Sequence, residues 1–351
     1  MSLSVYSGSR VLVVGGAGFV GSNLVRKVLG LGAKEVVVVD NFLSSERSNL
    51  PEATALRVVE GSIADSSLLE SIGSIWDYVF HLATYHGNQS SIADPIADHD
   101  NNTLTTLKLF DFLKHSRGIR KIVYASAGCT VAEKTYEHAT ATTEDAPISL
   151  YYDSPYQISK VVGEMYANYY HARHGLPVVK ARFQNVYGPG EVLGAGKWRG
   201  TPATVWRNVT PSFVYRALKG MPITVDNGGQ TSRDFIFVDD IVRGLLLGGS
   251  TSEPGAVFNL ASGVETTILT LAETIQRLAG SHCEIIGAPK RDWDRSGKRF
   301  GSTEQAQKTL GFSAEVGLEA GLKATIEWTQ SNLERIEACI QRHSAHMATS
   351  G

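Results

Sequence analysis

Short apolar runs alternate with longer amphipathic segments over the first 180 residues of the chain. The runs are rich in β-branched residues and predict strands at Val11–Val14, Val36–Val39, Leu56–Val59, Tyr78–Phe80, Ile122–Ala125 and Val178–Ala181. Between them, apolar positions recur at helical spacing over Phe19–Leu29, Asp98–Lys114 and Ser159–His174. Continuous apolar strands that alternate with helices are typical of a parallel sheet covered on both faces. We therefore predict an α/β fold with a doubly wound parallel sheet.

The pattern changes after Asn185. A stretch rich in Gly and Pro predicts a long loop to about residue 208, followed by a helix over Pro211–Lys219. Further on, we expect strands at Arg233–Val238 and Val257–Leu260 and helices at Asp239–Leu247, Thr267–Leu278 and Leu318–Arg342. This order predicts a sheet domain at 1–185 to which 234–262 returns, a smaller mixed region at 186–233 and 263–342, and a flexible tail at 343–351.

Composition and charge narrow the class of protein. The chain has 351 residues, of which 42% are hydrophobic and 19% charged, so it can bury a large core. A net charge of −2 provides no overall field for nucleic acid or an anionic membrane, and we expect neither as a partner. No apolar run is long enough to span a bilayer and no secretory signal is evident, so we expect a cytoplasmic protein.

Cysteines and histidines give no sign of a metal site. The three cysteines, at positions 129, 283 and 339, form no CxxC pair, which fits reduced thiols rather than a disulfide framework. The ten histidines are scattered, and the pair His171 and His174 is typical of a solvated helix face. We therefore expect no metal.

A glycine-rich turn follows the first predicted strand. Gly15, Gly18 and Gly21 stand between an apolar strand and an amphipathic helix, where small residues let the backbone approach a pyrophosphate at the helix N-terminus. Asp40 ends the second strand, where a carboxylate accepts hydrogen bonds from an adenosine ribose. A carboxylate there repels a 2′-phosphate and no Arg occurs in 41–45, so the pattern favours NAD over NADP.

A tyrosine and a lysine lie one helical turn apart in the segment SPYQISK. Tyr156 and Lys160 share a helix face, and a neighbouring ammonium favours the phenolate of a tyrosine. Tyr156 could then take a proton from a hydroxyl while hydride leaves for NAD. The spacing also occurs in exposed tyrosines that pack over a lysine stem, so it needs support from the rest of the chain.

That support is a resemblance. A glycine-rich first turn, an acidic end to the second strand and YxxxK together resemble the extended short-chain dehydrogenases, in particular the NAD-dependent epimerase/dehydratase family. Further matches are the segments Val79–Ala83, Ser91–Pro95 with Asn102, Arg182–Gly190 (RFQNVYGPG) and Arg233–Asp240 (RDFIFVDD). The resemblance covers about residues 10 to 312. It implies a Rossmann domain, a smaller substrate-binding region, NAD as cofactor, a nucleotide sugar as substrate and a homodimer.

The family pattern also implies which residues contact the ligands. Substrate contacts are expected from Asn185 and Arg233, which would bind the diphosphate, and from Arg291 in a turn further along the chain. Besides Tyr156 and Lys160, cofactor contacts are expected from Gly15, Gly18, Phe19, Val20, Gly21, Asp40, Asn41, Ser62, Ile63, Leu82, Ala83, Thr84 and Asn102. Arg233 and Arg291 also admit plainer interpretations, a salt bridge for Arg233 and a surface charge for Arg291.

One catalytic position departs from the family. The resemblance expects a Ser or Thr after the fifth strand to bind the reacting hydroxyl, but an ungapped alignment puts Ala127 there. Ser126, Cys129 and Thr130 are the candidates to replace it. Family members that eliminate water or carbon dioxide carry acidic residues at the next positions, where this chain has Gly128 and Cys129, which argues against a 4,6-dehydratase or a decarboxylase.

Cys129 suggests a competing reaction. GDP-mannose 3,5-epimerases, which are related, carry an acid/base cysteine here, and a thiol can exchange the acidic proton beside a 4-ketone. In those enzymes a lysine partners the cysteine. Its expected position falls near Val209, so this chain lacks it there, and Lys197 in the inserted loop is the candidate to compensate. The plainer interpretation of Cys129 is a small apolar residue at a strand end.

The sequence therefore predicts an NAD-dependent nucleotide-sugar 4-epimerase that acts through a transient 4-keto sugar. A 3,5-epimerase, a 4,6-dehydratase or decarboxylase, and a non-catalytic NAD-binding protein are the alternatives; retention of Tyr156 and Lys160 argues against the last. The loop Glu191–Asn208, with Trp198, Arg199, Trp206 and Arg207, admits two roles, ligand binding and packing. The expected dimer interface uses the helices at about Asp98–Lys114 and Ser159–His174.

Overall fold

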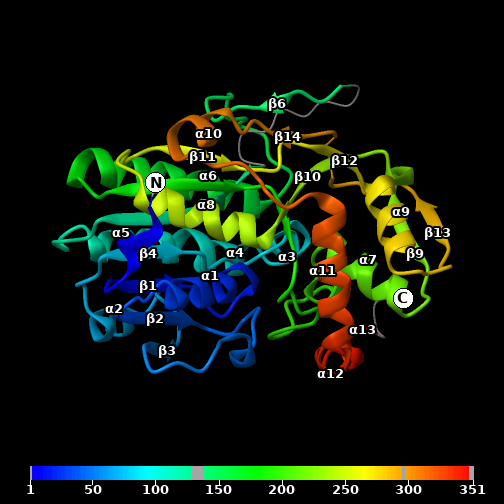
Figure 1. Ribbon diagram of the computed structural model, residues 1–351, viewed down its shortest axis with the longest axis horizontal. Helices are drawn as coiled ribbons and strands as arrows, with labels where there is room; N and C mark the ends of the chain where they lie inside the picture. The colour runs from blue at the N-terminus through cyan, green and yellow to red at the C-terminus, as the bar shows by residue number, and fades with distance from the viewer. Residues whose placement is uncertain (1, 129–137, 295–296, 348–351) are drawn as a thin grey trace.

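A seven-stranded parallel sheet dominates the computed structural model, which describes residues 2–128, 138–294 and 297–347 (Figure 1). Its strand order is β11-β7-β5-β4-β1-β2-β3. The strands are β1 (Arg10–Val14), β2 (Glu35–Asp40), β3 (Leu56–Glu60), β4 (Tyr78–His81), β5 (Lys121–Ala127), β7 (Val178–Phe183) and β11 (Val257–Leu260). All seven predicted strands of this sheet are confirmed. The central strands β1, β2 and β4 are almost wholly apolar because helices cover both of their faces, whereas the edge strand β3 is partly exposed.

Helices cover the two faces of the sheet in pairs. On one face, α1 (Phe19–Gly30) packs against α8 (Val238–Ser250), and their Leu24 and Leu245 are fully buried. On the other face, α5 (Thr105–Leu113) and α6 (Pro155–His174) bury Phe110 and Tyr170. The doubly wound prediction is therefore confirmed.

Helix α6 begins at Pro155, four residues before the predicted start at Ser159. Ser154 has an extended backbone and precedes Pro155, which takes the first helical position. The backbone N–H at that position has no partner within a helix, so its absence in proline costs no hydrogen bond. The predicted helix Asp98–Lys114 is a continuous run of α4 (Pro95–Asp98), the π-helix η3 (His99–Leu104) and α5. Shorter helices of this half are η1 (Leu3–Tyr6), η2 (Arg47–Asn49), α2 (Ser66–Ile72) and α3 (Asn88–Ala93).

A smaller mixed region lies at one end of the large sheet (Figure 1). It contains the sheet β12-β10-β8 and the pairs β13-β9 and β14-β6. Its strands are β6 (Ala141–Thr142), β8 (Asn185–Tyr187), β9 (Ile223–Asp226), β10 (Ser232–Phe237), β12 (Glu265–Thr267), β13 (Ile285–Ala288) and β14 (Phe300–Gly301). Its helices are α7 (Val209–Leu218), α9 (Ile268–Leu278) and α11 (Leu318–Ser331), with the short η5 (Pro202–Thr204) and η6 (Asn227–Gly229). Helix α10 (Glu304–Leu310) instead packs against β11 and α8 of the large-sheet half.

The segment 234–262 divides between the two regions. Strand β10 pairs with β8 and β12 in the small sheet, whereas α8 and β11 return to the large sheet. Strand β8 lies in a stretch that the glycine and proline content predicts as the start of a loop, because its three residues gain their hydrogen bonds only from β10, far along the chain.

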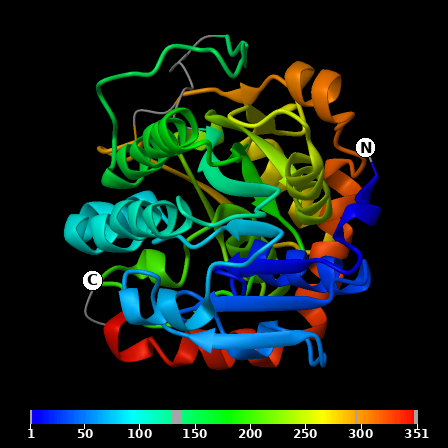
Figure 2. The same ribbon diagram turned by 90° about the vertical axis from the view of Figure 1, so that its left-hand side faces the viewer.

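The predicted helix Leu318–Arg342 is two helices, α11 and α12 (Leu333–Gln341), which meet at Asn332. A short helix α13 (Ser344–Met347) follows within the expected tail. Figure 2 shows α12 and α13 running beneath β2 and β3. In the described part of the chain, no helix has the length and apolarity required to cross a membrane.

Candidate active site

One cavity of about 660 Å³ extends from the glycine turn of β1 to the small region. Its large-sheet side is formed where β1, β2, β4, β5 and β7 end, and its far side includes residues of β9 and β10. Ligands of open parallel sheets bind outside the carboxyl ends of the strands. The fold therefore brings most of the sequence-predicted candidates into one space.

The glycine turn is packed too closely to admit larger residues. Gly15 has a φ of 81°, and a Cβ there would lie 2.5 Å from the backbone nitrogen of Ala83. A Cβ on Gly21 would lie 2.2 Å from the carbonyl oxygen of Gly15. Gly18 precedes the first residue of α1, so the open N-terminus of that helix faces the cavity beside it. This is the cradle that a pyrophosphate requires.

Asp40 joins the glycine turn to the loop that follows β2. Its Oδ2 accepts a hydrogen bond from the Ala17 backbone at 2.9 Å, and its Oδ1 accepts from the Phe42 backbone and the Ser45 hydroxyl, both at 2.9 Å. Burial raises the pKa of Asp40, and these three donors oppose that shift. The Gly18 backbone opposes it as well, so Asp40 lines the cavity as a carboxylate held by the glycine turn itself.

The other expected cofactor residues lie around the same space, with one exception. Those that line the cavity are Phe19, Val20, Asn41, Ser62, Ile63, Leu82, Ala83 and Thr84. Asn102 is instead buried behind it, where its Oδ1 accepts from the Tyr85 backbone at 2.7 Å and from the Thr84 hydroxyl at 3.1 Å. Asn102 therefore orients the loop after β4 rather than lining the cavity.

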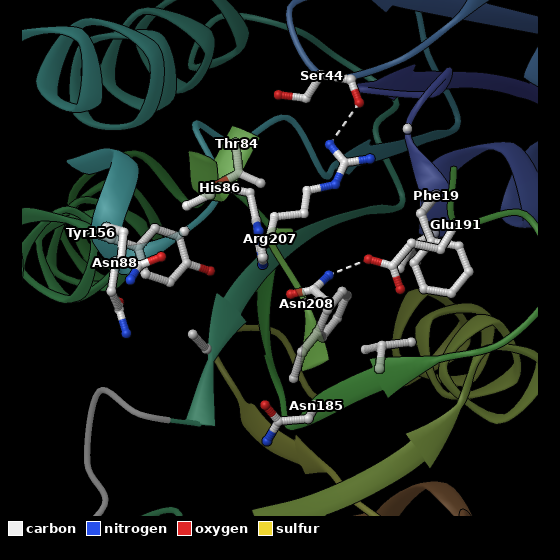
Figure 3. A pocket seen from close by; sticks show the side chains of 18 of the residues that line it. Phe19, Ser44, Thr84, His86, Asn88, Tyr156, Asn185, Glu191, Arg207 and Asn208 are labelled. Carbon is white, nitrogen blue, oxygen red and sulfur yellow. Dashed lines mark hydrogen bonds between the residues drawn. The ribbon is translucent and has the colours of Figure 1, made fainter. Parts of the chain in front are cut away.

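Tyr156 and Lys160 both line the cavity, and Figure 3 shows Tyr156 in it. The Lys160 ammonium lies 5.8 Å from the centre of the Tyr156 ring and donates a 3.0 Å hydrogen bond to the Ala125 carbonyl. Lys160 is only 3% exposed, so its charge acts on the phenol through little water. This arrangement favours the phenolate form that proton abstraction needs.

Of the three candidates to replace the missing hydroxyl, the structure describes Ser126. Ser126 lines the cavity, but its hydroxyl donates to Glu164 Oε1 at 2.5 Å. Glu164 in turn receives two 2.8 Å hydrogen bonds from the buried Arg182. Ser126 thus belongs to a buried ion-pair network. Cys129 and Thr130 lie outside the described residues.

The three predicted substrate residues all line the cavity in its small-region half. Asn185 begins β8 and donates to the Asp234 carbonyl at 3.3 Å. Arg233 lies 3.5 Å from the carboxylate of Asp294, and Arg291 lies 2.6 Å from that of Asp226. Each arginine therefore faces one carboxylate, and Arg233 is the better shielded, with a side chain only 11% exposed.

Two cavity features escape sequence reasoning. His86 follows β4 and lies beside Tyr156, with ring centres 5.9 Å apart (Figure 3). Burial lowers the pKa of His86 to about 3, helped by the charges of Arg207 and Arg199, so its imidazole is neutral at pH 7. A histidine six residues after the predicted strand end at Phe80 is the only sequence signal for it, and that signal is weak.

The second feature is a charged cluster in the long loop. Glu191 accepts from Asn208, and Arg207 donates to the Ser44 carbonyl at 2.9 Å (Figure 3). Burial raises the pKa of Glu191 to about 7 against the opposing effects of Arg207 and Asn208. Loop contacts with Ser44, in a different element, are a long-range property that local sequence does not encode.

The aromatic and basic groups of the loop 191–208 divide between the cavity and contacts within the protein. Trp206 and Arg207 line the cavity. Trp198 instead stacks on His346 at 4.9 Å, and Arg199 donates to the His86 carbonyl at 2.8 Å. Lys197, the candidate partner of Cys129, lines an outer hollow beside Glu46 rather than the cavity.

A dinucleotide cradle that leads to a tyrosine–lysine pair defines an NAD-dependent enzyme that moves hydride and proton together. The chain belongs to the NAD dependent epimerase/dehydratase family, which it matches over residues 11–279. The glycines and Asp40 fit the adenosine diphosphate part of NAD, and Tyr156 and Lys160 line the same cavity.

Solved structures and curated relatives agree with this membership. The enzyme WbmF of Bordetella bronchiseptica, solved in complex with NAD+ and UDP, is 55% identical, with a TM-score of 0.90 and 99% of both chains covered. A UDP-glucose 4-epimerase of Mycolicibacterium smegmatis is 32% identical, over 91% of this chain and 98% of its own. A dTDP-glucose 4,6-dehydratase of Streptomyces niveus is 29% identical, over 92% and 93%. The chain is thus an NAD-dependent enzyme of the nucleotide-sugar epimerase/dehydratase type.

Proposed function

We propose that this protein is a 4-epimerase of UDP-sugars. The observation that carries the proposal is a single cavity in which the cofactor cradle, the Tyr156–Lys160 pair and the arginines Arg233 and Arg291 line one continuous space. Complexes of relatives with UDP and with UDP-glucose support the choice of nucleotide.

The reaction follows from the positions of the protein groups. Asn185 and Arg233 would bind the diphosphate. Arg233 would then leave its ion pair with Asp294 and donate hydrogen bonds to phosphate oxygens. Tyr156, held toward its phenolate by Lys160, takes the proton of the sugar O4 hydroxyl. When bound in the glycine cradle, NAD would supply the hydride acceptor for C4 and the hydride donor for its return. The 4-keto sugar turns over in the cavity, receives the hydride on its other face, and Tyr156 returns the proton to O4.

Local composition supports epimerisation over elimination. Gly128 occupies a position where the family's dehydratases and decarboxylases carry an acid, so the described part of this segment has no carboxylate to drive loss of water or carbon dioxide. The small-region carboxylates Asp226 and Asp294 are each paired with an arginine. A 3,5-epimerase that uses Cys129 is the second candidate, favoured by that residue type alone.

The test is NMR of the purified protein with UDP-, GDP-, CDP- and dTDP-sugars in deuterium oxide. We expect one UDP-sugar to equilibrate with its C4 epimer without carbon-bound deuterium, because the hydride returns to the carbon from which it came. Deuterium at C3 or C5 would overturn the proposal in favour of Cys129. A 4,6-dehydration of the sugar, or its decarboxylation, would equally overturn the proposal.

We also propose that the protein is a homodimer whose interface uses α6 and the neighbouring segment with α4 and α5. Apolar side chains stand exposed along one stripe of α6: Ile158 at 50%, Met165 at 54% and Tyr169 at 54%. Ile96 of α4, a helix that contacts α6, is 71% exposed. Surfaces of this kind commonly bind a partner.

Light scattering after size exclusion tests the dimer. We expect Met165→Glu to shift the protein to monomer, because a charge would be buried at the helix contact. Met221→Glu, at an exposed methionine after α7, is the matched control and should leave the mass unchanged. A wild type of monomer mass would contradict the proposal.

A further inference from the structure

The amide of Gln184 occupies space that two glycines leave open. A Cβ on Gly128 would lie 2.2 Å from Gln184 Nε2, and a Cβ on Gly301 would lie 2.9 Å from the same atom. Gly128 follows β5 and Gly301 ends β14, so the amide lies between two separate parts of the fold. Either side chain would displace it.

This amide lies beside the departure from the family pattern. Ala127, at the position of the missing hydroxyl, pairs with Phe183 in the β5–β7 ladder, and Gln184 is the next residue after Phe183. Ala127, Gln184 and Tyr156 all line the cavity. The chain therefore offers a polar side chain at the end of the strand that neighbours Ala127, in the cavity where a hydroxyl is expected.

The side chain of Gln184 is also available for a ligand. Its backbone nitrogen donates to the Leu260 carbonyl at 3.3 Å, which fixes the residue between β7 and β8. Within the described ranges 2–128, 138–294 and 297–347, its amide group makes no hydrogen bond. By contrast, the neighbouring Ser126 hydroxyl is engaged by Glu164 at 2.5 Å.

We propose that Gln184 replaces the missing hydroxyl and positions the reacting sugar oxygen, by donating from Nε2 to the sugar O4 beside Tyr156. The amide N–H groups stabilise O4 as it becomes a ketone oxygen, and they need no proton transfer of their own. Gly128 and Gly301 are glycines because the amide requires their empty side-chain volume. This inference rests on the proposed epimerase activity.

The first experiment separates the polarity of Gln184 from its packing. Gln184→Met keeps a long unbranched side chain but removes the donors. We expect kcat to fall about 100-fold, as for loss of one transition-state donor, while KM and calorimetric UDP affinity change less than about threefold. Gln307→Met, at an exposed glutamine of α10, is the control and should leave kcat unchanged.

The decisive experiment is rescue. Adding Ala127→Ser to Gln184→Met returns the expected hydroxyl, and we expect it to restore kcat at least about tenfold. A residue that merely fills space would not be rescued in this way. The proposal is overturned if Gln184→Met keeps kcat within about twofold, or if the double variant is as slow as the single one. Absence of turnover by the wild type would instead refute the proposed function itself.

Discussion

The two ends of the cavity are built in different ways. At the cofactor end, one continuous strand–turn–helix supplies close backbone approach, and the glycines at 15, 18 and 21 do their work by lacking side chains. At the substrate end, charged side chains arrive from separate elements, such as Arg233 of β10 and Arg291 after β13. The shape of the cofactor end is therefore set by one short segment of backbone, whereas the charges of the substrate end are brought together only by contacts between distant segments.

The largest effect is expected where the two ends meet. Tyr156→Phe should lower kcat about 1000-fold, because it removes the proton acceptor while leaving both binding ends intact. Stopped-flow absorbance of bound NADH and direct titration of NAD and UDP would check this. Full turnover in a folded variant would show that another group moves the proton.

At the cofactor end, a single added methyl group should be enough to weaken NAD binding. Gly15→Ala should weaken NAD binding about 100-fold, because the new Cβ meets the Ala83 backbone and the residue has a positive φ. The control is Gly30→Ala near the end of α1, where no atom lies within 4 Å of the added Cβ. Calorimetry with NAD measures both, and equal affinities would mean that the turn does not bind the pyrophosphate.

The substrate end should weaken without disturbing the cofactor. Arg233→Lys should reduce UDP affinity about 30-fold, since a lysine cannot make the paired hydrogen bonds of a guanidinium with a phosphate. NAD affinity should stay the same. Arg277→Lys, in an exposed pair with Glu319, is the control. Loss of NAD affinity in the Arg233 variant would contradict the division of the cavity into two ends.

Sequence predicts the first end far better than the second. The strands, the glycine turn and the position of Asp40 follow from short-range patterns, and the structure has all of them. The pairing of Arg207 with Ser44 and the location of His86 beside Tyr156 do not, because each depends on contacts between distant segments. The same holds for β8, which is too short to recognise without its partner β10.

The smallest effect concerns the buried acid of the long loop. Glu191 keeps its proton in the folded protein up to about pH 7, whereas an unfolded chain releases it near the ordinary pKa of 4.5. Over that interval the folded state binds more protons, so the free energy of unfolding falls as pH rises.

Glu191→Gln should therefore gain stability over the wild type from pH 5 to pH 8, by about 2 kcal/mol at the upper end. Urea unfolding at several pH values measures the difference. The exposed Glu273→Gln should show no such trend. A gain that does not grow with pH would mean that Glu191 is already charged in the folded protein.

The loop 43–46, which follows Asp40 at the cofactor end, is held in place by residues far along the chain. The Leu43 carbonyl accepts from the Lys197 backbone at 3.0 Å, and Glu46 accepts from the Gly196 backbone at 3.0 Å and from Arg342 at 2.7 Å. His343 in turn contacts the Gly194 carbonyl at 2.9 Å. During synthesis, the glycine turn and Asp40 emerge long before these supports. The loop after β2 can therefore take its final conformation only once the C-terminal helices have been made.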